Sequence, residues 1–150
     1  MELKPRDTKE GILDKAMYGV IIFQAVAISG ACLLAYYLGV RKYGLTEAGL
    51  DEIRTIVFTT LISAELLRAF SSRSQDYTLF KIGFFSNKAM NKAVLVSFAL
   101  TVIVLYVPFL NGIFHTVPLS AEDWIIVLLL AFFPLVIGEI YKMALKKQVK

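Results

Sequence analysis

The sequence predicts an all-α membrane protein with four transmembrane helices and both termini in the cytoplasm. Hydrophobic residues make up 57% of its 150 residues, and its mean hydropathy is +0.67. The charged residues gather between apolar runs of about 20 residues, the length that crosses a bilayer as a helix. We expect these helices at about 16–38, 53–70, 89–110 and 122–141, in one domain that covers residues 1–150.

The first run follows the mixed-charge segment Glu2–Lys15 and has no small-residue cleavage pattern behind it. This arrangement is not that of a signal peptide, so we expect the span to stay in the mature chain. A repeat of small residues, Ala27, Ala31 and Ala35, favours close packing of another helix. For Gln24, in the same run, an interhelical hydrogen bond is the commoner role of an amide in a membrane.

The second run, 53–70, is the shortest and the most polar of the four. It contains Glu65, with Arg68 one helical turn beyond it. Four hydroxyl residues precede the carboxylate and are expected to line the approach to it: Thr55, Thr59, Thr60 and Ser63.

The connection at 71–88 ends in an aromatic stretch with lysines, which predicts a segment lying along the membrane interface. Pro108 and the pair Asn111-Gly112 mark the end of the third span. Ser120 is a suitable N-cap for the fourth span.

Within the fourth span, Pro134 predicts a packing kink. The spacing of Glu139 and Lys142 favours an exposed helical ion pair. The single histidine, His115, is expected to be a solvated loop residue, because no cysteine or second histidine is near it. Cys32 is the only cysteine, so no intramolecular disulfide can form.

The basic residues set the topology. Thirteen of the 16 lysines and arginines precede the first span, surround the connection between the second and third spans, or follow the fourth span. Positively charged loops stay in the cytoplasm, so both termini are predicted there. The net charge of +4 is therefore a signal of topology and of attraction to anionic lipid, and no sign of nucleic-acid binding.

Glu65 is the candidate functional residue. A carboxylate at the centre of a membrane helix costs roughly 2.5–3.5 kcal/mol and is tolerated where it faces a partner, a cavity or an ion. Ligation of a cation, or of a proton, is one interpretation. The other is an internal ion pair with Arg68, in which Glu65 is a structural residue; the sequence leaves both open.

Four segments carry a family resemblance: MELKPRDTKEGIL, TTLISAELLRAFSSRS, LFKIGFFSNKAMNKAV and LYVPFLNGIFHTVPLSAEDWIIVLLLAFFPLVIGEIYK. They resemble the C-terminal membrane region of P-type cation-transporting ATPases of the calcium-pump type, over essentially the whole chain. The resemblance implies that the four spans are the seventh to tenth membrane helices. It also implies Ca²⁺ as the transported ion, with Glu65 at the position of a glutamate that contributes one oxygen to a calcium site. Arg68 stands where the animal pumps have a neutral polar residue.

Other parts of such a pump are missing from the sequence. The chain has no Asp-Lys-Thr-Gly phosphorylation motif and no glycine-rich phosphate loop, so we expect no ATPase activity from it alone. ATP and Mg²⁺ would act only through domains that this chain lacks. Ca²⁺ takes about six to eight oxygens, so the other ligands would come from the remaining membrane helices of the pump.

The sequence thus predicts a membrane module that supports the transport helices of a calcium pump and contributes Glu65 to the ion site. Its partners would be the other helices and cytoplasmic domains of the pump, and the lipid bilayer. The alternative is a free-standing four-helix membrane scaffold or regulator without transport activity. An autonomous channel or exchanger is a weaker possibility, because only one acidic residue lies at the membrane centre.

Overall fold

The computed structural model describes residues 15–72, 83 and 87–148, and these residues contain helices and no strand. The helices are α1 (Lys15–Tyr43), α2 (Glu47–Ser71), α4 (Lys88–Tyr106), α5 (Pro108–Phe114) and α6 (Ala121–Gln148). The all-α class is therefore confirmed for this part of the chain. The first 14 residues, and most of the 71–88 segment expected at the membrane interface, lie outside the described residues.

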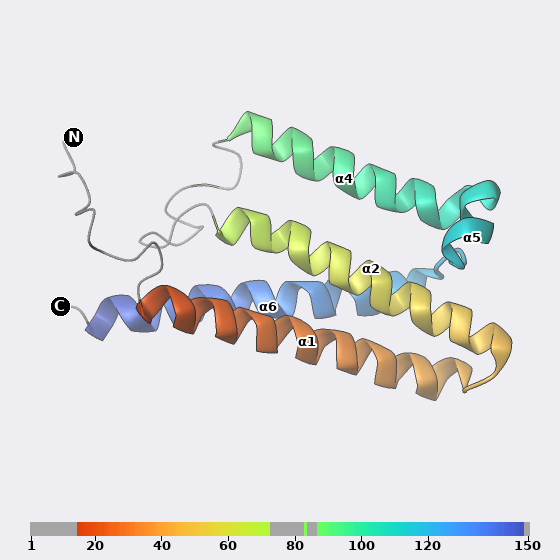
Figure 1. Ribbon diagram of the computed structural model, residues 1–150, viewed down its shortest axis with the longest axis horizontal. Coiled ribbons are helices and arrows are strands. Elements are labelled where there is room, and N and C mark those ends of the chain that lie inside the picture. The colour runs from red at the N-terminus through yellow and green to blue at the C-terminus, as the bar shows by residue number, and fades with distance from the viewer. Residues whose placement is uncertain (1–14, 73–82, 84–86, 149–150) are drawn as a thin grey trace.

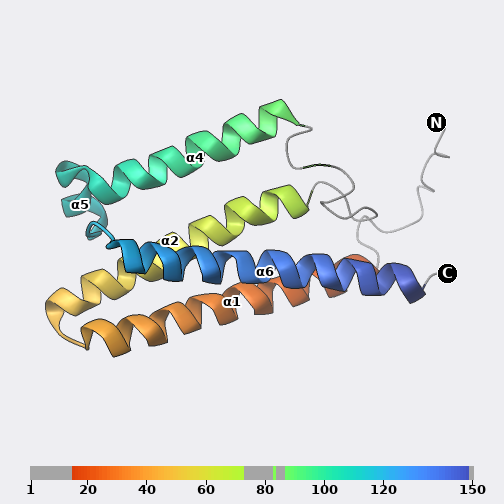
Figure 2. The same cartoon turned by 180° about the vertical axis from the view of Figure 1, so that it is seen from behind.

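Three long helices lie side by side, and a fourth stands apart from them (Figures 1 and 2). α1, α2 and α6 pack against one another, whereas α4 touches mainly α2 and α5. The short connection 44–46 lies at one end of the bundle, which we call the loop end. α1 begins and α6 ends at the opposite end, called the far end, where α2 also ends and α4 begins (Figure 1).

The packed face of α1 follows a regular stripe. Its buried residues recur at spacings of three and four, which place them on one face of a helix: Gln24, Ile28, Ala31, Ala35 and Gly39. Small side chains along this stripe allow the backbones of α1 and α2 to approach closely. At Gly39 an added Cβ would lie 3.1 Å from Ile53 Cγ1.

The core lies between these helices in two adjacent clusters. One joins Ala35, Ile56 and Val127 with Leu105 of α4 and Leu119. The other cluster, nearer the far end, joins Ile28 of α1, Ala64 of α2 and Ala131 of α6. Each cluster takes one or more residues from α1, α2 and α6, so α2 is in contact with the two apolar helices along much of its length.

The third expected helix, 89–110, is divided in the structure. α4 ends at Tyr106, and Pro108 is the first residue of α5. Proline has no backbone N–H to donate to the carbonyl four residues earlier, at Val104. The Thr116 hydroxyl donates to that carbonyl instead, at 3.2 Å, and the Asn111 amide donates to the Leu105 carbonyl at 2.9 Å. Both of these carbonyls at the helix break therefore have a hydrogen-bond partner.

The other helices run beyond their expected bounds. α1 continues to Tyr43, where Gly44 turns the chain with φ +71°. The Thr46 hydroxyl then caps α2 by accepting from Gly49 N at 3.1 Å. α6 continues through Pro134 as far as Gln148.

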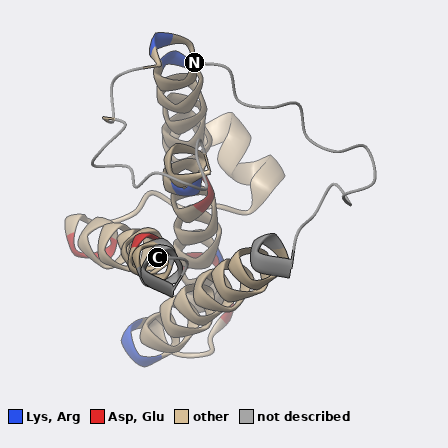
Figure 3. Ribbon diagram, turned by 90° about the vertical axis from the view of Figure 1, so that its left-hand side faces the viewer, with Lys and Arg blue, Asp and Glu red and all other residues tan. Residues whose placement is uncertain are grey.

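Three helical segments in the described part of the chain are long and apolar enough to cross a membrane: Tyr18–Tyr43, Lys88–Tyr106 and Ala121–Tyr141. Figure 3, a view along the bundle, shows that most of the helical ribbon is uncharged. The chain is thus a multi-pass integral membrane protein. α2 is not among these three segments, because Arg54, Glu65 and Arg68 make it more polar.

Candidate functional site

Glu65 lies at the level of the centre of the apolar bundle. Its neighbour Ala64 packs with Ile28 and Ala131 in one core cluster. Ala131 is the midpoint of the apolar segment Ala121–Tyr141. Glu65 therefore lies level with the middle of this apolar segment, and the middle of a bilayer is the most costly position for an unpartnered charge.

The Glu65 side chain lies on the face of α2 opposite the buried Ile56. It follows Ile56, which is 1% exposed, by nine residues, or two and a half helical turns, so the two side chains lie on opposite faces of α2. Glu65 accordingly retains 48% of its side-chain exposure. The bundle packs against the opposite face of α2, so the Glu65 carboxylate remains accessible.

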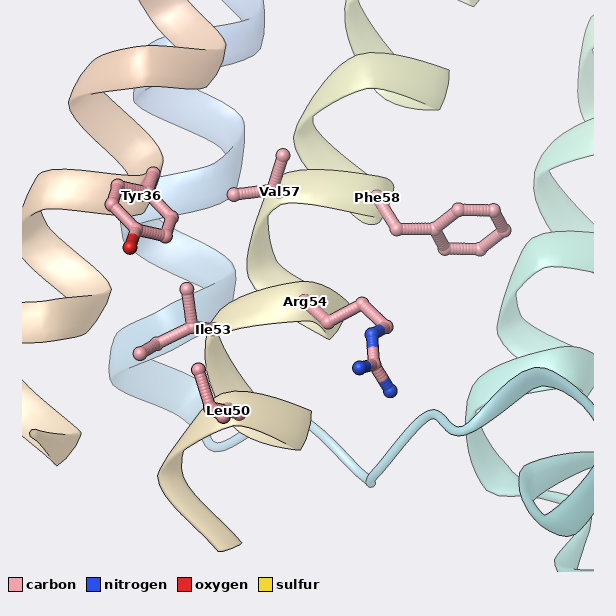
Figure 4. Close-up of a pocket in the computed structure, with 6 residues that line it drawn as sticks. All are labelled: Tyr36, Leu50, Ile53, Arg54, Val57 and Phe58. Atoms are coloured by element: carbon pink, nitrogen blue, oxygen red, sulfur yellow. The ribbon is translucent and has the colours of Figure 1, made fainter. Parts of the chain in front are cut away.

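The same face of α2 carries Phe58, seven residues before Glu65. Figure 4 shows Phe58 extending toward α4, while Ile53 lies on the side of Tyr36 and α1. α4 itself is buried only at Thr101 and Leu105, in its C-terminal half. The part of α4 nearer its start therefore leaves the face of α2 that carries Glu65 uncovered.

Arg68 is the direct partner of Glu65. Its Nε donates to Glu65 Oε2 at 3.0 Å, one helical turn away. Its Nη1 also reaches Gln24 Oε1 of α1, at 3.4 Å. The structure thus brings the two sequence-predicted charges together, and it confirms an interhelical hydrogen bond for Gln24.

The four hydroxyl residues do not line the approach to Glu65, contrary to expectation. Thr55, Thr59, Thr60 and Ser63 are buried on the packed face of α2, because their spacing from Glu65 turns them toward the other helices. Thr55 accepts from Val117 N at 3.0 Å and Thr59 donates to the Thr55 carbonyl. The hydroxyls of Thr60 and Ser63 have no hydrogen-bond partner among the described residues.

Glu139 is a buried carboxylate whose environment the sequence did not reveal. It is 4% exposed and accepts a hydrogen bond from the Ser71 hydroxyl at 2.5 Å. The predicted exposed position of Glu139 is therefore wrong, since α2 covers this face of α6. The side chain of Lys142 lies outside the described residues, so the ion pair itself stays a prediction. The only signal for this contact in the sequence was the hydroxyl of Ser71, the residue that follows the second predicted span.

Asp123 is a second buried carboxylate, at the loop end. It is 0% exposed and accepts from Tyr43 Oη at 2.6 Å, from Ser120 Oγ at 2.5 Å and from Lys42 Nζ at 3.0 Å. Ser120 was expected as a helix cap, and its spacing of three from Asp123 agrees with that role. The partners Lys42 and Tyr43 come from α1 and could not be inferred from the local sequence.

A shallow apolar pocket opens near the loop end, distinct from the Glu65 region. Figure 4 shows the residues that line it: Tyr36, Leu50, Ile53, Arg54, Val57 and Phe58.

No group of three or more His, Cys, Asp or Glu side chains suited to a metal ion occurs within the described residues. His115 is exposed, with a left-handed φ of 51°. The described residues thus offer one accessible carboxylate at mid-depth.

These features define a multi-pass helical membrane protein, in which Glu65 is the one accessible acidic residue that the described residues place at the centre of the apolar layer. The chain belongs to the family described as "Cation transporting ATPase, C-terminus", which matches residues 1–144. The resemblance inferred from the sequence is thereby confirmed.

Individual relatives agree with the family match. The chain is 32% identical to "Calcium-transporting ATPase 1" of Bacillus cereus over 97% of its length, and 33% identical to "Calcium-transporting ATPase" of Bacillus subtilis over 89%. It is 31% identical to "Calcium-transporting ATPase type 2C member 2" of Rattus norvegicus over 95%. The match spans 18%, 15% and 15% of these three proteins, respectively.

Proposed function

We propose that this chain acts as the C-terminal membrane region of a P-type ATPase that transports Ca²⁺, and that Glu65 contributes one oxygen to the ion site. The observation that carries the proposal is the position of Glu65. The carboxylate lies at mid-depth on the face of α2 that the bundle leaves open. The names of the relatives support Ca²⁺ as the transported substrate.

The proposal includes four transmembrane spans, namely the three apolar segments and α2 in addition. Arg54, Glu65 and Arg68 make α2 too polar to be assigned as a span by composition, but its packing against two apolar helices supports the assignment. The far end would then face the cytoplasm, because most of the basic residues belong to segments at that end. Both termini would lie on the same side.

The rest of the ion site would come from other helices of the pump. Ca²⁺ binds about six to eight oxygens, and the open face of α2 is where further helices can approach. The function of α1 and α6 would be to hold α2 in place, with its hydroxyl side chains used for packing and its carboxylate turned outward. ATP and Mg²⁺ would be bound by cytoplasmic domains of the same pump.

The substitution Glu65→Gln tests the site assignment in an ATPase assembled with this chain as its C-terminal membrane region. The amide keeps the size of the side chain but removes a negative charge that attracts the cation. We expect the Ca²⁺ concentration for half-maximal ATP-driven ⁴⁵Ca²⁺ uptake to rise by roughly tenfold or more, the effect of about 1.4 kcal/mol. An unchanged Ca²⁺ dependence would show that Glu65 is not a ligand.

A further inference from the structure

We propose that Arg68 is an internal counter-ion of the empty site, and that Gln24 is the acceptor to which its guanidinium moves when a divalent cation occupies Glu65. This inference rests on the proposed function of Glu65. It assigns a positioning function to Arg68 and Gln24, two polar residues that do not themselves bind the transported ion.

The first support is the geometry of the guanidinium. Arg68 contacts its two acceptors through different nitrogen atoms, Nε toward Glu65 at 3.0 Å and Nη1 toward Gln24 at 3.4 Å. The shorter contact is with the carboxylate and the longer one is with the amide. The guanidinium already contacts both acceptors, so a small rotation of the side chain can lengthen the contact with Glu65 and shorten the contact with Gln24 while the guanidinium stays hydrogen-bonded.

The second support is the way Gln24 is held. Gln24 is 7% exposed, so its amide is confined between helices, whereas Arg68 and Glu65 retain 38% and 48% of their side-chain exposure. Behind the amide lies Gly138 of α6, where an added Cβ would be 3.0 Å from Gln24 Nε2. The acceptor is thus fixed on α1, and the two charged side chains are the parts free to move.

The third support is electrostatic. A guanidinium and a divalent cation on the same carboxylate repel each other, and repulsion between charges is strong in a medium of low dielectric constant. Cation binding at Glu65 therefore requires the guanidinium to withdraw. Without a second acceptor the withdrawn charge would lose its hydrogen bonds at mid-membrane depth, which is costly.

The proposal predicts effects of opposite sign for two residues in the same network. Arg68→Gln removes the competing charge, so the half-saturating Ca²⁺ concentration should fall. Gln24→Leu removes the acceptor that receives the guanidinium, so this concentration should rise. We expect changes of about two- to fivefold, the range that a half-exposed ion pair supports. Gln24→Glu offers a stronger acceptor and should lower the half-saturating concentration.

The experiment measures ATP-driven ⁴⁵Ca²⁺ uptake against Ca²⁺ concentration in the assembled ATPase, since the half-saturating concentration does not depend on how much protein folds. Arg54→Gln is the matched control. Arg54 forms an ion pair with Asp51 on the same helix, at 2.9 Å and with the same spacing of three, and both side chains are about half exposed. This control should leave the Ca²⁺ dependence unchanged.

Each result has one meaning. If Arg68→Gln and Gln24→Leu change the half-saturating concentration in the same direction, or if Arg68→Gln leaves it unchanged, the counter-ion proposal is wrong and the pair is structural. If Glu65→Gln itself leaves the Ca²⁺ dependence unchanged, the proposed site fails, and the counter-ion proposal fails with it. A clear effect of Glu65→Gln without opposite effects at Arg68 and Gln24 overturns the counter-ion proposal alone.

Discussion

The Lys42 ammonium donates to Asp123 Oδ1 at 3.0 Å and so joins the last turn of α1 to the first turn of α6. The two residues are 81 positions apart in the chain. Asp123 is completely buried, whereas Lys42 keeps 31% of its side-chain exposure. The contact links the loop-end termini of two helices that are far apart in the sequence.

Replacing Asp123 with Ala should destabilise the bundle strongly. The change leaves the hydroxyls of Tyr43 and Ser120 without their acceptor and removes the buried partner of Lys42, and the loss of such an acceptor costs about 1–3 kcal/mol. The thermal unfolding temperature of the detergent-solubilised chain measures the effect. Glu122→Gln is the control, because Glu122 binds the same lysine at 2.9 Å but is 80% exposed, so its loss should cost at most about 1 kcal/mol. Equal effects of the two changes would contradict the prediction.

Replacing Ser71 with Ala should lower the free energy of unfolding by about 1–3 kcal/mol, since the Ser71 hydroxyl donates to the buried carboxylate of Glu139. The next residue is a matched control. The Ser72 hydroxyl donates to the Ala69 carbonyl at an exposed position, at 3.1 Å, so Ser72→Ala should cost less. Denaturant or thermal unfolding compares the two variants, and a larger effect at Ser72 would show that the Ser71–Glu139 contact adds little stability.

Replacing Gly138 with Ala should displace Gln24, because the new methyl group would lie 3.0 Å from Gln24 Nε2. We expect a stability loss of about 1–3 kcal/mol, the typical cost of overpacking a tight contact. Gly30→Ala is the control at an open position, with nothing within 4 Å of an added Cβ; it should stabilise the helix slightly, since alanine favours helix over glycine. Thermal unfolding would contradict the prediction if both changes stabilise the chain.

The four-span topology can be tested with single cysteines, because Cys32 is the only native one. In a Cys32→Ser background, Thr46→Cys and Ser72→Cys place a thiol just before and just after α2. If α2 crosses the membrane, a membrane-impermeant maleimide applied to intact cells should label the first variant and not the second. Permeabilised cells provide the control that both thiols react. Labelling of both variants in intact cells would show that α2 does not cross.

The size of the native polypeptide distinguishes the pump region from a free-standing scaffold. An antibody against the peptide ALKKQVK, residues 144–150, detects the protein in membranes of the source cells. The proposed function predicts a band several times larger than 16.8 kDa. A band at 16.8 kDa would mean that the chain exists separately, and its assembly with other pump subunits would then have to be sought.

Much of the fold follows from the sequence alone. Apolar runs of membrane length predict helices because the bilayer offers no water to backbone groups, which must bond within the helix. The same local logic predicted the end of the third span near Pro108 and the cap at Ser120. The family resemblance was also contained in the sequence, since it rests on four continuous segments that need no tertiary contact to be recognised.

Only the tertiary structure decided which polar groups are buried and which are accessible. The sequence predicted an exposed position for Glu139, yet α2 covers it, and Asp123 is completely buried beside Lys42 and Tyr43 of α1. The hydroxyls before Glu65 face the core, and the carboxylate faces outward and binds Arg68. The physical reason is that hydropathy and spacing describe one helix at a time, whereas burial and pairing depend on which face of each helix meets its neighbours.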